Sequence, residues 1–222
     1  IYWGAETTVG GDTAINFAQA IIKDEGEVFY EILLKDVAAG VYPYIRVSVT
    51  YQNYDVYYNL NNVPTGGSST TNLLNQKGTL ASFVGYNTHI TSIPVKNMTH
   101  NVNANKLQGY WAFETDLSSP YNVANNIYSG QAQGTTVVNP LSASVATPPG
   151  SCLVTGSFSG SSLQITGNET SDIVVTLSFS VNKSFEWADT NGNGKLDIDA
   201  GTPANTELVV DMGLRGLLAT FQ

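Results

Sequence analysis

Apolar and polar residues alternate along much of this chain with the period of a β-strand. Between 44 and 51, every second residue is a β-branched apolar residue, and the residues between them are polar. This period of two is typical of a strand that buries one face. Other apolar runs of strand length end at Gly, Pro or Asn turns, and they lie at 29–34, 79–86, 90–95, 102–115, 152–158, 162–167, 172–187 and 206–217. About nine or ten strands at short spacing predict an all-β chain, folded as an antiparallel β-sandwich or jelly-roll.

Two polar stretches interrupt this pattern. Residues 59–77 are rich in Asn, Gly, Ser and Thr, which predicts a loop. Residues 116–150 are rich in Ser, Pro, Asn, Gly and Ala, and they predict a long loop or excursion. Loops of that length inside a compact domain are unusual and often functional. Because the strands after it are too few for a second sandwich, we expect a single β-sandwich domain over 1–222.

The composition indicates where in or outside the cell the protein is located. Only 12% of the 222 residues are charged, well below the usual quarter, and the net charge is −9. Surfaces built from Asn, Thr, Ser and Gly are typical of secreted β proteins. The acidic balance lacks the basic footprint of nucleic-acid binding, and no apolar run approaches a transmembrane span. We therefore expect a secreted or bacterial cell-surface protein associated with the outer membrane.

The first residue, Ile1, and the single cysteine, Cys152, add two expectations. Ile1 opens a strand-like stretch with no signal peptide before it, as expected of a mature or trimmed form. The single cysteine, Cys152, excludes a disulfide within the chain and is expected to be a buried, inert thiol.

One segment near the C-terminus indicates metal chemistry. Calcium takes six to eight oxygen ligands, and a short loop supplies them when alternate residues point inward. The motif Asp189-x-Asn191-x-Asn193-Gly194 has oxygen side chains at its first, third and fifth positions and glycine at its sixth. The seventh residue offers a backbone carbonyl, and acidic residues follow at the ninth and eleventh. The predicted cofactor is Ca²⁺, and the predicted ligands are Asp189, Asn191, Asn193, Lys195, Asp197 and Asp199.

The twelfth position of this loop holds Ala200, where an EF-hand has a bidentate Glu. A closing carboxylate must then come from elsewhere in the region 186–211, and the candidates are Asp199, Glu186, Glu207 and Asp211. The mixture of carboxylates and amides predicts the modest affinity of extracellular calcium sites. The alternative is an Asn/Gly-rich hairpin turn without metal, which uses the same residue types.

The motif from Asp189 to Gly194 resembles EF-hand and dockerin-type calcium loops, although a strand-like segment precedes it instead of a helix. More broadly, residues 185–217 and 40–49 are similar to the C-terminal part of secreted or lipid-anchored proteins of Bacteroidetes-type bacteria. This resemblance implies a compartment and a β fold, and it supplies no activity.

Catalytic signatures are scarce, and no catalytic residue is predicted. His89 and His100 lack a nucleophile elbow or a helical zinc motif around them. A glycosidase needs two facing carboxylates, and the best single candidate, Glu186, adjoins the predicted calcium loop. We therefore expect a non-enzymatic, calcium-binding module for binding or assembly.

Two alternatives stay open. The first is a carbohydrate-binding module or carbohydrate-active enzyme that stacks sugars on Trp111, Trp187 or the tyrosines in 54–58. The second is a subunit of a surface filament or envelope complex. The expected partner is a glycan or another surface protein, and an oligomer is compatible with either alternative.

Overall fold

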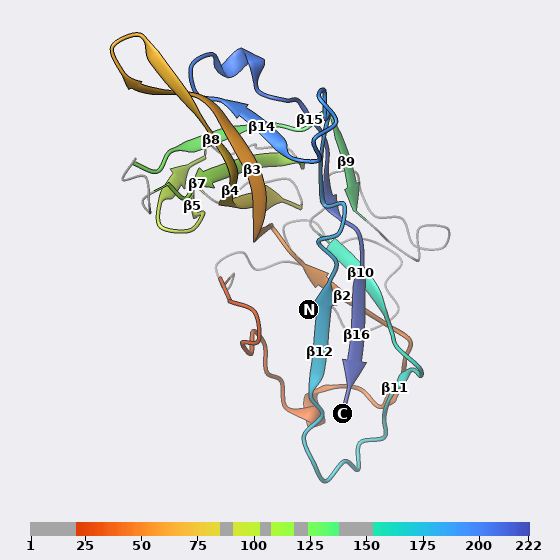
Figure 1. Cartoon of the computed structure of the whole chain (residues 1–222). Coiled ribbons are helices and arrows are strands. Elements are labelled where there is room, and N and C mark those ends of the chain that lie inside the picture. The colour runs from red at the N-terminus through yellow and green to blue at the C-terminus, as the bar shows by residue number, and fades with distance from the viewer. Residues whose placement is uncertain (1–20, 85–90, 103–107, 118–123, 138–152) are drawn as a thin grey trace. The chain divides into compact units, whose positions relative to one another are not determined.

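The computed structural model describes residues 21–84, 91–102, 108–117, 124–137 and 153–222 (Figure 1). Across these ranges the regular structure is β, apart from the short 3-10 turns η2 (Leu34–Asp36) and η3 (Pro203–Asn205). The prediction of a mostly β chain is therefore confirmed. Within the same ranges, no helix has the length and apolar character that crossing a bilayer requires.

The chain divides into two compact units. Unit 1 comprises 1–49, 137–180 and 215–222, and unit 2 comprises 50–136 and 181–214. The single domain over 1–222 stays a prediction.

Unit 2 is built on a five-stranded sheet. The order is β14 (Leu196–Asp199), β3 (Tyr51–Gly66), β4 (Ser69–Phe83), β7 (Tyr110–Thr115) and β8 (Ile127–Gln131). The strands β3 and β4 form one long hairpin (Figure 1). β14 joins the edge of the sheet in parallel with β3, with Leu196 opposite Tyr58 and Asp199 opposite Asn61.

Two smaller sheets complete unit 2. The first has the order β13 (Phe185–Trp187), β15 (Val209–Leu214) and β9 (Gly134–Val137). The second is the hairpin of β5 (Ser92–Pro94) and β6 (Thr99–Asn101). β13 therefore leads into the predicted calcium loop, and β14 leads out of it.

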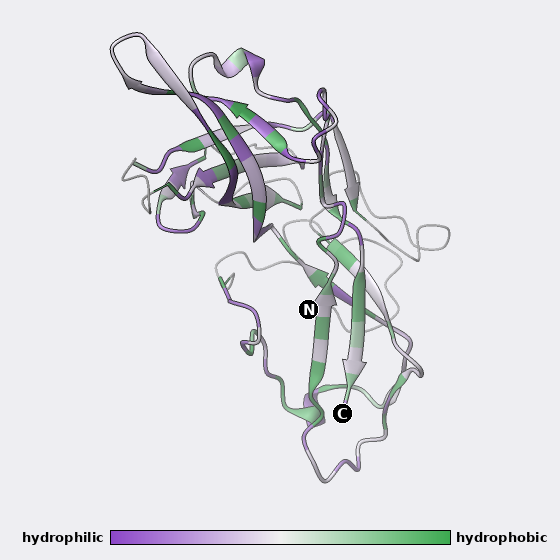
Figure 2. Ribbon diagram, viewed as in Figure 1, coloured by the Kyte–Doolittle hydropathy of each residue, from purple (hydrophilic) through white to green (hydrophobic). Residues whose placement is uncertain are grey.

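The core of unit 2 fixes the orientation of β14. Leu196 and Ile198 are buried in a cluster with Tyr58, Phe113 and Met212. Successive side chains of a strand point to opposite faces, so the acidic residues of β14 point away from this cluster. Figure 2 shows the alternation of hydrophobic and hydrophilic residues along this strand.

Unit 1 contains a four-stranded sheet of order β12 (Val175–Phe179), β16 (Leu217–Phe221), β10 (Leu153–Phe158) and β2 (Tyr44–Ser48). A second, two-stranded sheet pairs β1 (Gly40–Tyr42) with β11 (Leu163–Ile165). β10 and β16 run parallel, as do β14 and β3 in unit 2. The two larger sheets are therefore mixed, so the predicted antiparallel pairing is present only in part, and the sandwich or jelly-roll stays a prediction.

The predicted loop at 59–77 is also wrong, because β3 and β4 extend through it. In this polar stretch the β3–β4 register is broken at several positions. Asn62 and Asn75 have φ angles of 56° and 55° there, a conformation that Asn adopts more readily than most residues. The bulges interrupt the hairpin locally, and pairing resumes beyond them.

Other predicted boundaries shift as well. No strand forms over 29–34. The run 172–187 is two strands, β12 and β13, and 206–217 divides between β15 and β16. The excursion 116–150 contains β8 and β9, and its segments 118–123 and 138–150 lie outside the described residues, as do His89 and Cys152.

A buried carboxylate holds the tip of the β5–β6 hairpin. Glu114 of β7 is only 1% exposed. Its Oε2 accepts backbone N–H bonds from Lys96 at 2.9 Å and from Asn97 and Met98 at 3.0 Å. One acceptor oxygen thus satisfies three consecutive donors of the turn.

Glu114→Gln is expected to lower the free energy of unfolding by about 1.5–3 kcal/mol, because a neutral amide oxygen accepts more weakly than a carboxylate and the amide NH2 would face the Asn97 N–H that Oε1 now accepts. Asp116→Asn is the matched control, since it removes the same charge from a partly exposed ion pair with Lys96 and should cost about 0–1 kcal/mol. Urea denaturation of both variants measures the difference. Equal costs for the two substitutions would contradict this account of the turn.

Candidate metal centre

The predicted calcium loop joins β13 to β14, and its two ends are tied together. The indole Nε1 of Trp187 donates to the carbonyl oxygen of Lys195 at 3.0 Å. Just inside, the backbone N–H of Ala188 donates to the carbonyl of Leu208 at 2.9 Å. The segment from Trp187 to Lys195 is therefore a loop whose two ends are held together.

Asp189 organises the backbone of the loop. Its Oδ1 accepts from the N–H groups of Gly192 at 2.8 Å and Asn193 at 3.1 Å, and its Oδ2 accepts from Gly194 at 2.8 Å. Gly192 and Gly194 have φ angles of 73° and 72°, a region that disfavours residues with a Cβ. The φ angle of Gly194 is consistent with the glycine at the sixth position of the loop motif.

Two amide side chains of the loop converge on one carboxylate oxygen. The Nδ2 groups of Asn191 and Asn193 each donate to Oδ2 of Asp197 at 2.7 Å. The loop motif thus brings its third, fifth and ninth positions together through hydrogen bonds, and their role as calcium ligands stays a prediction. The Oδ1 atoms of the same two amides accept the backbone N–H groups of Asn193 and Lys195, at 3.0 and 2.7 Å.

The other oxygen of Asp197 faces β3. Its Oδ1 accepts from Nδ2 of Asn59 and from Nδ2 of Asn61, each at 3.0 Å. Asp197 is 8% exposed, so the carboxylate is held among four amide donors with little water. Burial alone would raise its pKa, but the donations from Asn61, Asn59, Asn191 and Asn193 outweigh burial and lower the pKa below the ordinary value.

Glu207 braces the loop from the side of β15. Its Oε1 accepts the backbone N–H of Thr190 at 2.7 Å and the Thr190 hydroxyl at 3.0 Å. Its Oε2 accepts the N–H of Asp197 at 3.0 Å. Of the four candidates for a closing carboxylate, Glu207 therefore joins both ends of the loop through hydrogen bonds.

The structure does not bring the Asp199 carboxylate into these contacts. Its Oδ1 accepts from the N–H groups of Gly201 at 2.9 Å and Thr202 at 2.7 Å, and its Oδ2 accepts from Asn62 at 2.8 Å. The donation from Thr202 is the main cause of its lowered pKa. Asp199 therefore holds the turn after β14.

The remaining candidates, Glu186 and Asp211, are opposite each other in the β13–β15 ladder. Asp211 accepts the hydroxyl of Thr136 at 2.8 Å. Lys195, a predicted ligand through its carbonyl, directs its ammonium group to the Tyr57 ring, 5.2 Å from the centroid.

Several carboxylates of the loop region are not paired with basic side chains among the described residues. In the part of the chain that the structure describes, no Lys or Arg forms an ion pair with Asp189, Asp197, Asp199 or Glu207. Nor do three carboxylate, imidazole or thiol groups gather closely enough there to hold a metal by themselves. A cation at this loop would need amide and carbonyl oxygens in its shell, as calcium accepts.

Comparison of the chain with protein-family models, with curated proteins and with solved structures finds no match. Function is therefore inferred from the residues and geometry of the loop.

The candidates for stacking on a sugar differ in exposure. Trp111 is 8% exposed and Tyr58 is fully buried, so neither ring is accessible, whereas Tyr57 is 55% exposed and Trp187 is half-buried. His100 Nε2 lies 2.7 Å from the Tyr110 hydroxyl. Glu114 holds the β5–β6 turn, as described above.

Sequence reasoning missed Asn59 and Asn61, because both fell in the predicted loop. The signal available was their spacing of two, which places both amides on one face of a strand. Their contact with Asp197 requires the parallel pairing of β14 with β3, which no local pattern specifies.

Asp197→Asn is expected to destabilise the chelator-treated protein by about 1–3 kcal/mol at neutral pH, since four amide donors then face one acceptor oxygen fewer. The carboxylate has a lowered folded-state pKa, so its contribution is present above the ordinary value of about 4 and disappears as pH falls through the lower one. Urea midpoints across this range should therefore converge for the two proteins in acid. A gap that stays constant well below that pKa would contradict the assignment.

Proposed function

We propose that this protein is a non-enzymatic, calcium-binding β module of the cell surface or secreted space, in which the ion stabilises the region 186–211. The observation that supports it best is the convergence of Asn191, Asn193 and Asp197 within a loop that begins at Asp189. The absence of a cationic partner for these carboxylates among the described residues favours a bound cation. The composition of the chain favours an extracellular compartment.

The amides adapt to an ion by a simple rotation. The oxygen and nitrogen of an Asn side chain exchange places when the amide turns by half a revolution. Turned in this way, Asn191 and Asn193 would present Oδ1 where they now present Nδ2 to Asp197. The backbone N–H groups of Asn193 and Lys195 would then lose the Oδ1 acceptors that they have here, and the bound ion would have to offset that loss. Asp189 and the carbonyl of Lys195 supply further oxygens of the kind calcium prefers.

In this proposal Asp197 is the closing carboxylate, and the twelfth-position Glu of an EF-hand is unnecessary. Glu207 acts behind it, because its oxygens already hold Thr190 and the backbone of Asp197. Asp199 stays with its own turn. The ion would therefore fasten β14, and through Asn59 and Asn61 the edge of β3, to the loop.

A site of this composition suits an environment with millimolar calcium, where dissociation constants of about 10⁻⁴–10⁻³ M are useful. At ten times the dissociation constant, the ion would add about 1.4 kcal/mol to the free energy of unfolding. The role of the ion is then structural, and the module serves binding or assembly.

Calcium added to chelator-stripped protein is expected to give a saturable heat of binding with one ion per chain and to raise Tm, while Mg²⁺ should do less because it dehydrates reluctantly. Asp189→Ala should remove both effects. Asp172→Ala, an equal change of charge at an exposed position of unit 1, should leave both intact. The proposal fails if the stripped wild-type protein shows neither heat nor a change in Tm at millimolar calcium.

A further inference from the structure

Among the described residues, one segment of unit 1 with a strand-like composition has no strand partner. Residues 27–33 have no assigned strand, and no backbone hydrogen bond joins 28–32 to another described residue. Every residue from Val28 to Leu33 except Glu31 is apolar or aromatic. Val28, Tyr30 and Ile32 are 66%, 48% and 36% exposed, so apolar surface and backbone groups face solvent together.

Unit 1 also has an open sheet edge. Among the described residues, β12 pairs with β16 on one side and with no strand on the other. Edge strands are usually protected by charges, Pro or bulges. β12 has none of these, since its sequence is Val-Thr-Leu-Ser-Phe and its register with β16 is regular.

The backbone groups that point outward from this edge are identifiable. Val174 exchanges both of its hydrogen bonds with Gln222, and the N–H of Ser180 donates to Gly216. In an antiparallel pair, residues that bond to the neighbour alternate with residues that face away. The outward N–H and C=O groups of β12 therefore belong to Val175, Leu177 and Phe179.

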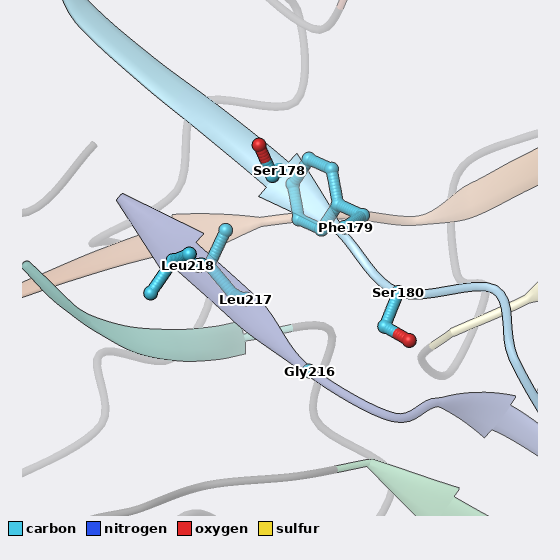
Figure 3. A pocket seen from close by; sticks show the side chains of 6 residues that line it. All are labelled: Ser178, Phe179, Ser180, Gly216, Leu217 and Leu218. Atoms are coloured by element: carbon cyan, nitrogen blue, oxygen red, sulfur yellow. The ribbon is translucent and has the colours of Figure 1, made fainter. Parts of the chain in front are cut away.

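The paired side of β12 is hollowed and apolar. A shallow groove of about 280 Å³ lies where β12 meets β16. The side chains of Phe179, Leu217 and Leu218 line it (Figure 3). Of these three residues, Phe179 is the one whose backbone groups point outward from the edge.

We propose that residues 28–33 of one copy of this chain add as a strand to the β12 edge of a second copy. The six residues of the donor span the five of β12, and its apolar side chains would cover Phe179, which is 39% exposed. β12 contains no charged residue, so Glu31 of the donor meets no like charge on it. Main-chain hydrogen bonds would supply affinity, and the alternate side chains would supply register, as in other cases of β-strand addition.

A second copy is the occupant that fits both surfaces. The chain contains the donor and the acceptor, and the donor forms no ladder with any other described residue. The donor continues into η2 and then β1, which β11 holds. Because the two surfaces differ, the contact is heterologous, and repetition gives a reciprocal dimer, a ring or a filament. This inference is independent of calcium binding.

The test is light scattering after size-exclusion chromatography, with the full-length chain from micromolar to near-millimolar concentration. The wild-type protein should associate as concentration rises. Tyr30→Lys should weaken association by at least about tenfold, whereas Leu208→Lys, at a residue of almost equal exposure, 49%, should not.

On the acceptor side, Leu177→Pro removes an outward N–H while leaving the bonds to β16, as Pro at a solvent-facing edge position allows. It should weaken association as Tyr30→Lys does, and circular dichroism should show that the fold remains. Phe179→Lys is the second acceptor variant, because it alters the groove without touching the backbone.

Mixing provides the decisive readout. Tyr30→Lys keeps an intact acceptor and Leu177→Pro keeps an intact donor, so an equal mixture should form a heterodimer that neither variant forms alone. A wild-type protein that stays monomeric over the whole range would overturn the proposal. So would association that survives both substitutions, or a mixture that stays monomeric.

Discussion

The buried carboxylate of Asp197 is the contact on which the C-terminal loop depends. One of its oxygens accepts from two amides of the loop, and the other accepts from two amides of β3. An ionised carboxylate has about four acceptor sites and no donor, so it satisfies all four amides at once. The same side chain therefore fixes the loop fold and attaches β14 to the sheet.

Neutral amides stabilise this carboxylate without cancelling its charge. Asp189, Asp197 and Glu207 are joined through short hydrogen bonds over a few residues, and the whole chain has a net charge of −9. The nearest cation in sequence, Lys195, places its ammonium over Tyr57. In the proposed function, a divalent ion would offset the repulsion that these hydrogen bonds leave.

The sequence revealed the part of this site that is local. The spacing from Asp189 to Asp197 and the glycines between them are properties of nine consecutive residues, and the structure closes them into one loop. Asn59 and Asn61 are 138 and 136 residues from Asp197, and their role depends on a parallel strand pairing. The composition of 59–77 predicted a loop because Asn and Gly disfavour strands on average, yet β3 and β4 pair through it with local register shifts, among them those at Asn62 and Asn75.

The segment 29–34 shows the opposite failure. Its apolar and aromatic residues predicted a strand, yet no strand forms there, because a strand also needs a neighbour to satisfy its backbone. Propensity for β structure mainly measures how well side chains pack against cross-strand partners, and an isolated segment gains none of that packing. Among the described residues the partner is missing, and the other edge of β12 is unpaired and uncharged. These are the two surfaces that the proposed self-association would join, since each supplies the backbone groups that the other needs.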